Sequence, residues 1–183
     1  MRRAELAHVL RAACRIAGDG NILVLGSQAI LGSHSEHELP DAAWMSMEVD
    51  VAFLHEDPAT PKWAAVDGAI GELSQFHQTF SYYAQGVEVT TASLPDGWRD
   101  RLVAFQPEDA EPARAVCLDK HDLVIAKLVA HREKDLTFAG ALLDAGLLDT
   151  SILLARVAAL SCVPPPTRRR VQQWLTAASK ARG

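Results

Sequence analysis

The segment at residues 47–54 constrains the fold of this chain more than any other. Its sequence, Met-Glu-Val-Asp-Val-Ala-Phe-Leu, alternates between polar and apolar residues and then becomes wholly apolar. Alternation is typical of a β-strand, and a continuous apolar run indicates a strand that is buried on both faces. The segment therefore predicts a central strand whose one end, carrying Glu48 and Asp50, reaches a functional edge of the sheet.

Glu48 and Asp50 lie two residues apart on this strand, so their side chains leave the same face and can converge. Neighbouring carboxylates repel each other unless a cation lies between them. Mg²⁺, or Mn²⁺ in its place, suits such a pair because it prefers hard oxygen ligands and shares them with substrate phosphates. The alternative is that both acids line the solvent-exposed face of a half-buried strand.

A second motif lies nearer the N-terminus. The apolar run at residues 21–25 is followed directly by Gly26 and Ser27, and then by residues typical of a helix start. In such a turn a glycine lets a phosphate approach the backbone, and helix N–H groups face the anion. The alternative is that Ser27 only caps the helix. The glycine pattern G-x-G-x-x-G does not follow this strand, which excludes a dinucleotide-binding fingerprint.

The remaining patterns predict an α/β (α+β) chain in two parts. Helical spacing marks residues 4–17 and 63–76, and two further strands are expected at 80–84 and 87–92. Residues 106–112 combine two prolines with acidic residues and are the predicted linker. Beyond it, helices are expected at 119–134, 136–145, 150–161 and 167–181. We therefore expect a mixed β-sheet core with flanking helices in residues 1–112 and a C-terminal helical bundle in residues 113–183.

Three lysines recur every seven residues in the helix predicted at 119–134. Lys120, Lys127 and Lys134 would therefore share one stripe of that helix, with His131 beside it. Apolar residues surround its middle, so Lys127 is predicted to lie near buried surface, where an unpaired ammonium is costly and an anionic partner is required. The alternative is an amphipathic bundle helix whose lysines extend to water.

The order of these motifs resembles the nucleotidyltransferase superfamily related to DNA polymerase β. The resemblance rests on hydrophobic-Gly-Ser at residues 25–27, followed by acid-hydrophobic-acid at residues 48–50. It implies a nucleotidyltransferase fold in which Glu48 and Asp50 hold the metal and Gly26 and Ser27 position phosphates. Glu88 best matches the third metal-binding carboxylate of that superfamily, where it would complete the metal site or accept a proton from the attacking hydroxyl.

Residues 117–135 are similar to a helical motif of bacterial nucleotidyltransferase-like proteins near the abortive-infection AbiEii toxins, in which a lysine and an aspartate of this region are essential. The resemblance implies that Lys127 reaches a nucleoside triphosphate and offsets its charge. It also implies that Arg132, Lys134 and Asp135 frame the same cleft and bind the nucleotide.

Together the two resemblances imply a Mg²⁺-dependent enzyme that transfers a nucleoside monophosphate from a nucleoside triphosphate and releases pyrophosphate. The acceptor would be an RNA such as tRNA, a protein or a small molecule, and a toxin–antitoxin role with an antitoxin as partner is implied as well. A second hypothesis is a catalytically silent module of the same fold that binds a nucleotide or a protein partner. A third is an RNA-binding module that uses Arg168, Arg169 and Arg170.

The composition excludes some classes of binding partner. Lys plus Arg number 18 against 23 Asp plus Glu, a formal charge of -5, so sequence-specific DNA binding is not expected. Every apolar run is too short to span a bilayer and residues 1–5 lack a hydrophobic signal core, so we expect a cytoplasmic protein without membrane contact. Cys14, Cys117 and Cys162 lie far apart, which indicates reduced and mostly buried thiols.

Overall fold

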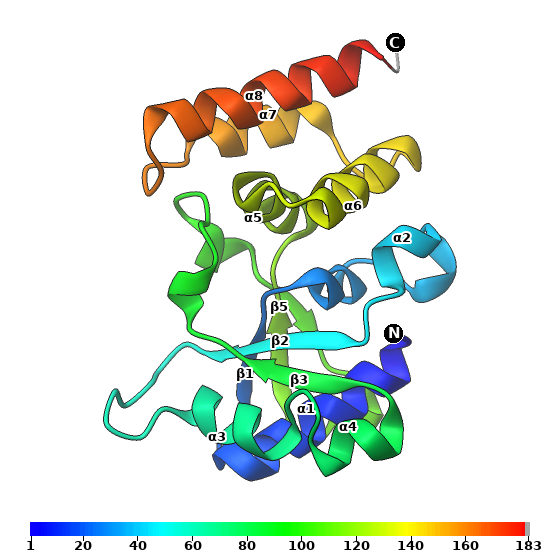
Figure 1. Cartoon of the computed structure of the whole chain (residues 1–183), viewed down its shortest axis with the longest axis vertical. Coiled ribbons are helices and arrows are strands. Elements are labelled where there is room, and N and C mark those ends of the chain that lie inside the picture. The colour runs from blue at the N-terminus through cyan, green and yellow to red at the C-terminus, as the bar shows by residue number, and fades with distance from the viewer. Residues whose placement is uncertain (182–183) are drawn as a thin grey trace.

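A mixed five-stranded sheet forms the centre of the computed structural model, which describes residues 1–181 (Figure 1). The strand order is β3-β2-β1-β5-β4. Strand β1 pairs with β2 in antiparallel fashion and with β5 in parallel, β2 pairs with β3 in parallel, and β4 pairs with β5 in antiparallel fashion. The strands are β1 Asn21–Val24, β2 Glu48–Phe53, β3 Tyr83–Gly86, β4 Val103–Phe105 and β5 Arg114–Cys117.

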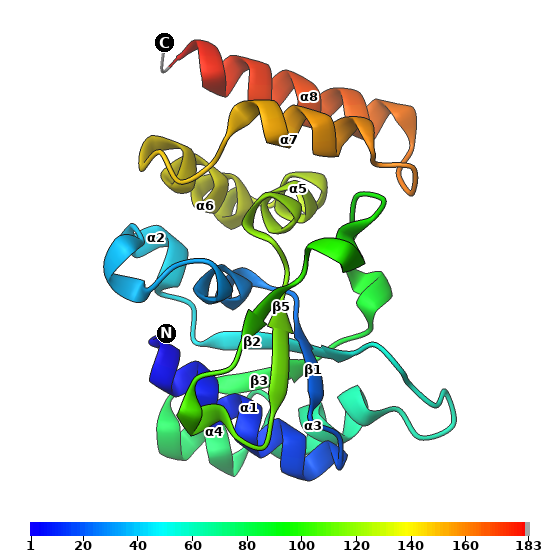
Figure 2. The same cartoon turned by 180° about the vertical axis from the view of Figure 1, so that it is seen from behind.

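Helices cover the sheet from two sides (Figures 1 and 2). Below it, in the orientation of Figure 1, lie α1 Arg3–Ala17, α3 Lys62–Ile70 and α4 Gln75–Phe80. Above it lie α5 Lys120–Ala130, α6 Glu133–Asp144, α7 Thr150–Ala158 and α8 Pro165–Lys180, with the short α2 Asp41–Trp44 at the side. Short 3₁₀ helices occupy the connections: η1 Ser27–Gly32, η2 Glu36–Glu38, η3 Val89–Thr91, η4 Trp98–Arg101 and η5 Glu108–Ala110.

The central strand predicted at residues 47–54 is confirmed as β2. Val49 and the stretch from Val51 to Phe53 are at most 2% exposed, whereas Glu48 and Asp50 are half-buried at the N-terminal end of the strand. Both neighbours of β2 carry apolar side chains, so the sheet and the helices beneath it share one hydrophobic core. The mixed α/β class expected from the sequence is therefore the observed one.

The strand predicted at residues 87–92 does not form. The ladder between β2 and β3 ends where Gly86 pairs with Val51, and the chain then enters η3. Helix α3 packs directly on Gly86, since a Cβ there would lie 1.9 Å from the backbone oxygen of Trp63. This contact deflects the chain out of the sheet. The strand expected at 80–84 also begins later, because α4 extends to Phe80.

The predicted linker at residues 106–112 lies between two strands of the sheet. Strand β5 follows it and pairs with both β1 and β4, so the sheet continues past the boundary expected at residue 112. The helical layer accordingly begins at Lys120. The reason is that Ala115 and Cys117 are fully buried between neighbouring strands, a contact that the local proline pattern does not reveal.

The helix predicted at residues 119–134 is two helices. His131 adopts a left-handed conformation with φ 59°, which ends α5 at Ala130, and α6 starts at Glu133. Lys134 therefore lies on a different helix from Lys127, and the single lysine stripe is wrong. Lys120 Nζ lies instead 3.2 Å from His34 Nε2.

Two further expectations concern the cysteines and the membrane. Cys14 and Cys117 are buried and Cys162 is exposed, and all three are free thiols. Among residues 1–181, no helix combines the length and the apolar character that crossing a membrane requires.

Candidate functional site

The antiparallel pairing of β1 with β2 brings Gly26 and Asp50 together. The C-terminal end of β1 lies beside the N-terminal end of β2, and the Leu25 backbone N–H donates a 3.0 Å hydrogen bond to the Asp50 carbonyl. A Cβ on Gly26 would lie 1.5 Å from Asp50 Oδ2. Glycine is therefore the residue that lets this carboxylate lie against the turn after β1.

Asp50 is an unusual carboxylate because it is half-buried next to a second acid. Burial, followed by the negative charge of Glu48, raises the pKa of Asp50 to about 6, and a hydrogen bond between the two side chains acts in the same direction. The positive charges of Lys127 and Lys134 oppose this rise. The two acids on β2 thus converge, as their spacing predicts.

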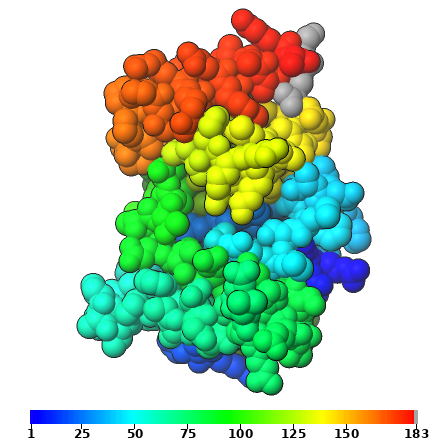
Figure 3. All heavy atoms as spheres, viewed as in Figure 1, coloured from blue at the N-terminus to red at the C-terminus, as the bar shows by residue number. Residues whose placement is uncertain are grey.

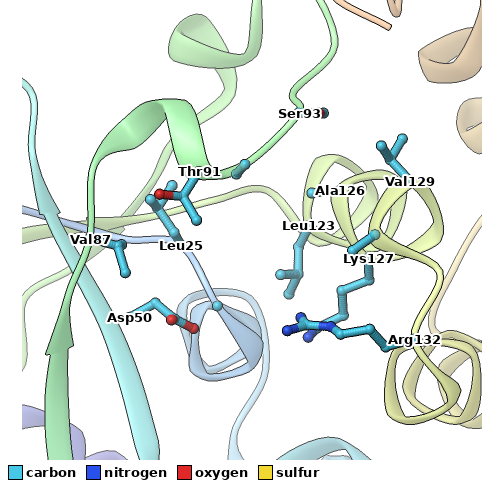
Figure 4. A pocket seen from close by; sticks show the side chains of 13 residues that line it. Leu25, Asp50, Val87, Thr91, Ser93, Leu123, Ala126, Lys127, Val129 and Arg132 are labelled. Carbon is cyan, nitrogen blue, oxygen red and sulfur yellow. The ribbon is translucent and has the colours of Figure 1, made fainter. Parts of the chain in front are cut away.

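A cavity of about 200 Å³ opens in front of Asp50. Gly26 and Asp50 line one side of it, and Lys127 and Arg132 line the other, so acidic and basic groups face each other across the cavity (Figure 4). Its walls also include aliphatic side chains and hydroxyl groups, contributed by Leu25, Val87, Thr91, Ser93, Leu123, Ala126 and Val129. In Figure 3 the surface is hollowed between the yellow α6, the green segment that follows β3 and the cyan residues around the start of β2.

Asp135 holds the two cations in place. Its carboxylate is fully buried and accepts hydrogen bonds from Lys127 Nζ at 3.2 Å and from Arg132 Nε at 2.6 Å. The Arg132 backbone N–H also donates to it, because Asp135 lies in the first turn of α6. Lys127 lies over the ring of Phe138, 4.8 Å from its centroid. The anionic partner that the sequence requires for Lys127 is therefore Asp135.

Burial and ion pairing shift the pKa values of Lys127 and Asp135 in opposite directions. Burial lowers the pKa of Lys127, and the charge of Asp135 partly offsets this effect. Burial would raise the pKa of Asp135, yet the hydrogen bond from Arg132 and the charge of Lys127 hold that pKa below its ordinary value. Asp135 is thus an anion that keeps Lys127 charged beside the cavity.

The comparison with known proteins bears on this geometry. A family model described as nucleotidyltransferase of unknown function (DUF6036) matches residues 4–180. The chain belongs to this family. No curated protein and no solved structure matches the chain. The DUF6036 match includes both the sheet and the helical layer, so the cavity between them lies inside the region that defines the family. It supports the nucleotidyltransferase superfamily, and the AbiEii-like branch stays a prediction.

Most of the site residues predicted for this DUF6036 protein lie at or next to the cavity. Gly26, Asp50, Lys127 and Arg132 line it. The other predicted residues take supporting or peripheral places: Glu48 beside Asp50, Asp135 behind the cations, Lys134 exposed on α6 within electrostatic reach of Asp50, and Ser27 half-buried as the first residue of η1.

Glu88 does not join the other acids. It precedes η3, accepts a hydrogen bond from Thr90 Oγ1 at 3.0 Å, and borders a different hollow that is lined by Trp63 and Arg99. The cause is the departure of the chain from the sheet after Gly86, which removes Glu88 from any strand register. Within residues 1–181, no group of three or more His, Cys, Asp and Glu side chains is placed so that it could hold a metal ion, and Glu48 and Asp50 meet without a third acid.

The sequence reasoning missed one wall of the cavity. Thr91 and Ser93 belong to it because residues 89–91 form a 3₁₀ helix instead of the expected strand. On the opposite wall, Leu123, Ala126 and Lys127 follow helical i, i+3, i+4 spacing, a signal that could have placed them on one face of α5.

Proposed function

We propose that this protein transfers a nucleoside monophosphate from a nucleoside triphosphate to a hydroxyl acceptor, with release of pyrophosphate. The observation that carries the proposal is the cavity in which Gly26 and Asp50 face Lys127 and Arg132. An acidic side suits a divalent cation and a basic side suits phosphate oxygens. A nucleoside triphosphate bound together with a divalent cation would match the charges on both sides of the cavity.

Glu48 and Asp50 would hold Mg²⁺, or Mn²⁺ in its place. The two residues fit such an ion because their side chains meet on one face of β2, and the negative charge of Glu48 helps to raise the pKa of Asp50 to about 6. Carboxylate oxygens are the ligands that both ions prefer. When bound, the ion would supply Lewis-acid stabilisation of the phosphate charge.

Lys127 and Arg132 would bind the phosphate oxygens from the side opposite Asp50. Asp135 orients both cations, so neither side chain has to be ordered when the nucleotide binds. Gly26 would keep the Asp50 carboxylate beside the turn, and Ser27 would position a phosphate from the start of η1. Lys134 would contribute charge from the rim.

In the proposed reaction, the oxygen of an acceptor hydroxyl attacks the α-phosphorus and loses its proton to water, the bond between that phosphorus and the bridging oxygen breaks, and pyrophosphate leaves in line with the attack. The direct test uses each α-labelled nucleoside triphosphate with Mg²⁺ and total cellular RNA or protein. We expect labelled acceptor with the wild-type protein and with the control Asp109→Ala, an exposed acid on η5, and no labelled acceptor with Asp50→Ala. Absence of label with the wild type, together with nucleotide binding that is independent of Mg²⁺, would favour a catalytically silent binding module.

RNA is the acceptor class that a specific contact favours. Arg170 Nη2 donates a 2.9 Å hydrogen bond to the backbone oxygen of Val129, a residue that lines the cavity. Arg169 and Arg170 are exposed, so this end of α8 presents positive charge near the proposed site. Changing both arginines to alanine is expected to weaken RNA binding and its salt dependence. Salt-sensitive RNA binding by the wild type without any transfer, retained in Asp50→Ala, would instead indicate an RNA-binding module.

A toxin–antitoxin role follows from the proposed activity and from the resemblance to AbiEii toxins. Expression of the wild-type protein in a bacterial host is then expected to arrest growth, and Asp50→Ala is expected to leave growth unaffected. Equal growth with both proteins, in cells where transfer activity is measurable, would argue against a toxin that acts alone.

A further inference from the structure

A buried ionic cluster lies behind the cavity, away from the groups assigned above. Asp122, in the first turn of α5, is 0% exposed. It accepts a bidentate pair of hydrogen bonds from Arg101 in η4, with Nε at 2.8 Å and Nη2 at 3.1 Å. Arg156 Nε, on α7, lies 3.1 Å from the same carboxylate. We call Asp122, Arg101 and Arg156 the Asp122 cluster.

The Asp122 cluster extends into the loop before η4. Arg101 also donates to the backbone oxygen of Asp96, at 3.2 and 3.1 Å. The Asp96 backbone N–H donates to the Ala159 carbonyl at 2.8 Å, and Ser161 Oγ donates to the Asp96 carboxylate at 2.6 Å. The segment at residues 96–101 is therefore bonded both to α5 and to the end of α7, and in Figures 1 and 2 the green loop rises beside the loop between α7 and α8.

These bonds act on the two walls of the cavity. Thr91 and Ser93 form one wall and lie directly before the bonded segment. Leu123 and Lys127 form the opposite wall and follow Asp122 on α5. The hydrogen bonds between Arg101 and Asp122 thus join α5, which carries one wall, to η4, which follows the segment that carries the other wall by a few residues.

The chemistry of the Asp122 cluster suits precise positioning. A bidentate pair between a guanidinium and a carboxylate fixes both distance and orientation, which apolar contacts do not. Buried ion pairs add little net stability compared with well-packed apolar residues, so their value here lies in the geometry that they impose. Asp122 touches none of the groups that face the phosphates.

We propose that Asp122 and Arg101 are positioning residues that set the separation of the two cavity walls and so determine how tightly the nucleoside part of the substrate is held. This inference rests on the proposed function. The nucleoside would lie between the segment at 91–93 and the aliphatic face of α5, because the charged groups at Asp50, Lys127 and Arg132 take the phosphates. A substitution in the Asp122 cluster would leave the binding of the phosphates unchanged.

Arg101→Lys is the variant that tests this role. It keeps the positive charge beside Asp122 but loses the bidentate geometry. Asp122→Asn would leave two half-buried cations without their anion and would risk unfolding. The control is Lys62→Met, which breaks the 2.7 Å ion pair between the half-buried side chains of Lys62 and Asp19, neither of which lines the cavity.

The measurement compares the binding of two probes in the presence of Mg²⁺. One is a non-hydrolysable nucleoside triphosphate, and the other is inorganic tripolyphosphate, which lacks the nucleoside. For Arg101→Lys we expect the Kd of the nucleotide to rise about tenfold, which corresponds to about 1.4 kcal/mol, while the Kd of tripolyphosphate stays unchanged. Lys62→Met is expected to leave both dissociation constants unchanged, even if it lowers Tm as much as Arg101→Lys does.

Parallel weakening of both probes in Arg101→Lys would indicate a general structural role and overturn the inference, as would unchanged binding of both. Neither result would touch the proposed function, since the wild-type protein would still bind the nucleotide with Mg²⁺. If the wild type binds neither probe, the proposed function fails and this inference fails with it.

Discussion

Asp50 links the stability of the fold to the proposed chemistry. Burial and the neighbouring Glu48 raise the pKa of Asp50 to about 6 from the ordinary value of 3.8, so the native state binds a proton more readily than the unfolded chain. Stability therefore falls as pH rises from about 4 to about 6, and above that window the ionised carboxylate destabilises the protein. A cation between Glu48 and Asp50 would relieve this repulsion.

Asp50→Asn is expected to raise the free energy of unfolding at neutral pH, because the amide removes the buried charge. A rise in pKa of about two units corresponds to an upper bound of about 3 kcal/mol, and we expect about 1–3 kcal/mol. The gain should shrink towards pH 4, where the wild-type side chain is protonated in the native state. Urea denaturation of the wild type and of Asp50→Asn, at neutral pH and near pH 4 and with a chelator present, measures the difference in the free energy of unfolding. A gain that is equal at the two pH values would show that the ionisation of Asp50 is not its cause.

Gly26→Ala tests the close approach of the turn to Asp50. The backbone at Gly26 has φ -79° and ψ -160°, which alanine can adopt, so the effect comes from the added Cβ alone. That atom would displace the Asp50 carboxylate, and we expect at least a tenfold loss of Mg²⁺-dependent nucleotide binding, or about 1.4 kcal/mol. Calorimetric titration gives the constant. Gly68→Ala is the control, since nothing lies within 4 Å of its added Cβ; a similar loss there would refute the steric explanation.

At the scale of elements, the corner between α5 and α6 builds the basic side of the cavity. His131 takes the left-handed conformation that reverses the chain after α5. Arg132 and Asp135 then return towards Lys127, and the ammonium, guanidinium and carboxylate groups meet. One residue with positive φ thus replaces a predicted continuous helix with a corner at which Lys127, Arg132 and Asp135 meet.

His131→Ile is expected to destabilise this corner, because a β-branched residue at positive φ costs about 1–2 kcal/mol. Tripolyphosphate binding should weaken with it, since Arg132 and Asp135 would no longer be held towards Lys127. His131→Gly should retain both stability and binding. Thermal unfolding and titration with tripolyphosphate measure the two effects. Equal behaviour of the isoleucine and glycine variants would show that the backbone conformation at His131 is not what matters.

Across the whole molecule, β5 joins the sheet to the helical layer. It lies between β1 and β4 and leads within a few residues into α5. The sheet therefore cannot be completed by residues that precede the expected boundary at residue 112. Since the cavity also takes one wall from each layer, the site forms only when both have assembled.

A fragment of residues 1–112 is expected not to fold, because β1 and β4 would each lose a strand partner and Ile22 and Phe105 would be exposed to water. Circular dichroism and urea titration compare the fragment with the full chain, which should unfold in one transition. A cooperative transition of the fragment would instead show that residues 1–112 form an independent domain.

Much of the local structure was determined by the sequence itself. The alternation that becomes wholly apolar in β2, the break at Gly26 and the requirement of Lys127 for an anion all arise from the burial and solvation of neighbouring residues. These effects act over a few residues, so periodicity and composition report them. The convergence of Glu48 and Asp50 belongs to the same class, because the pleat of a single strand places both side chains on one face.

Only the tertiary structure decided which of these features meet. The antiparallel pairing of β1 with β2 places Gly26 against Asp50, the packing of α3 on Gly86 turns Glu88 away, and β5 returns to the sheet after the expected linker. The left-handed turn at His131 likewise depends on the packing of α6 against α5. Each outcome reflects contacts between residues far apart in the chain, whose free energies leave no trace in local periodicity.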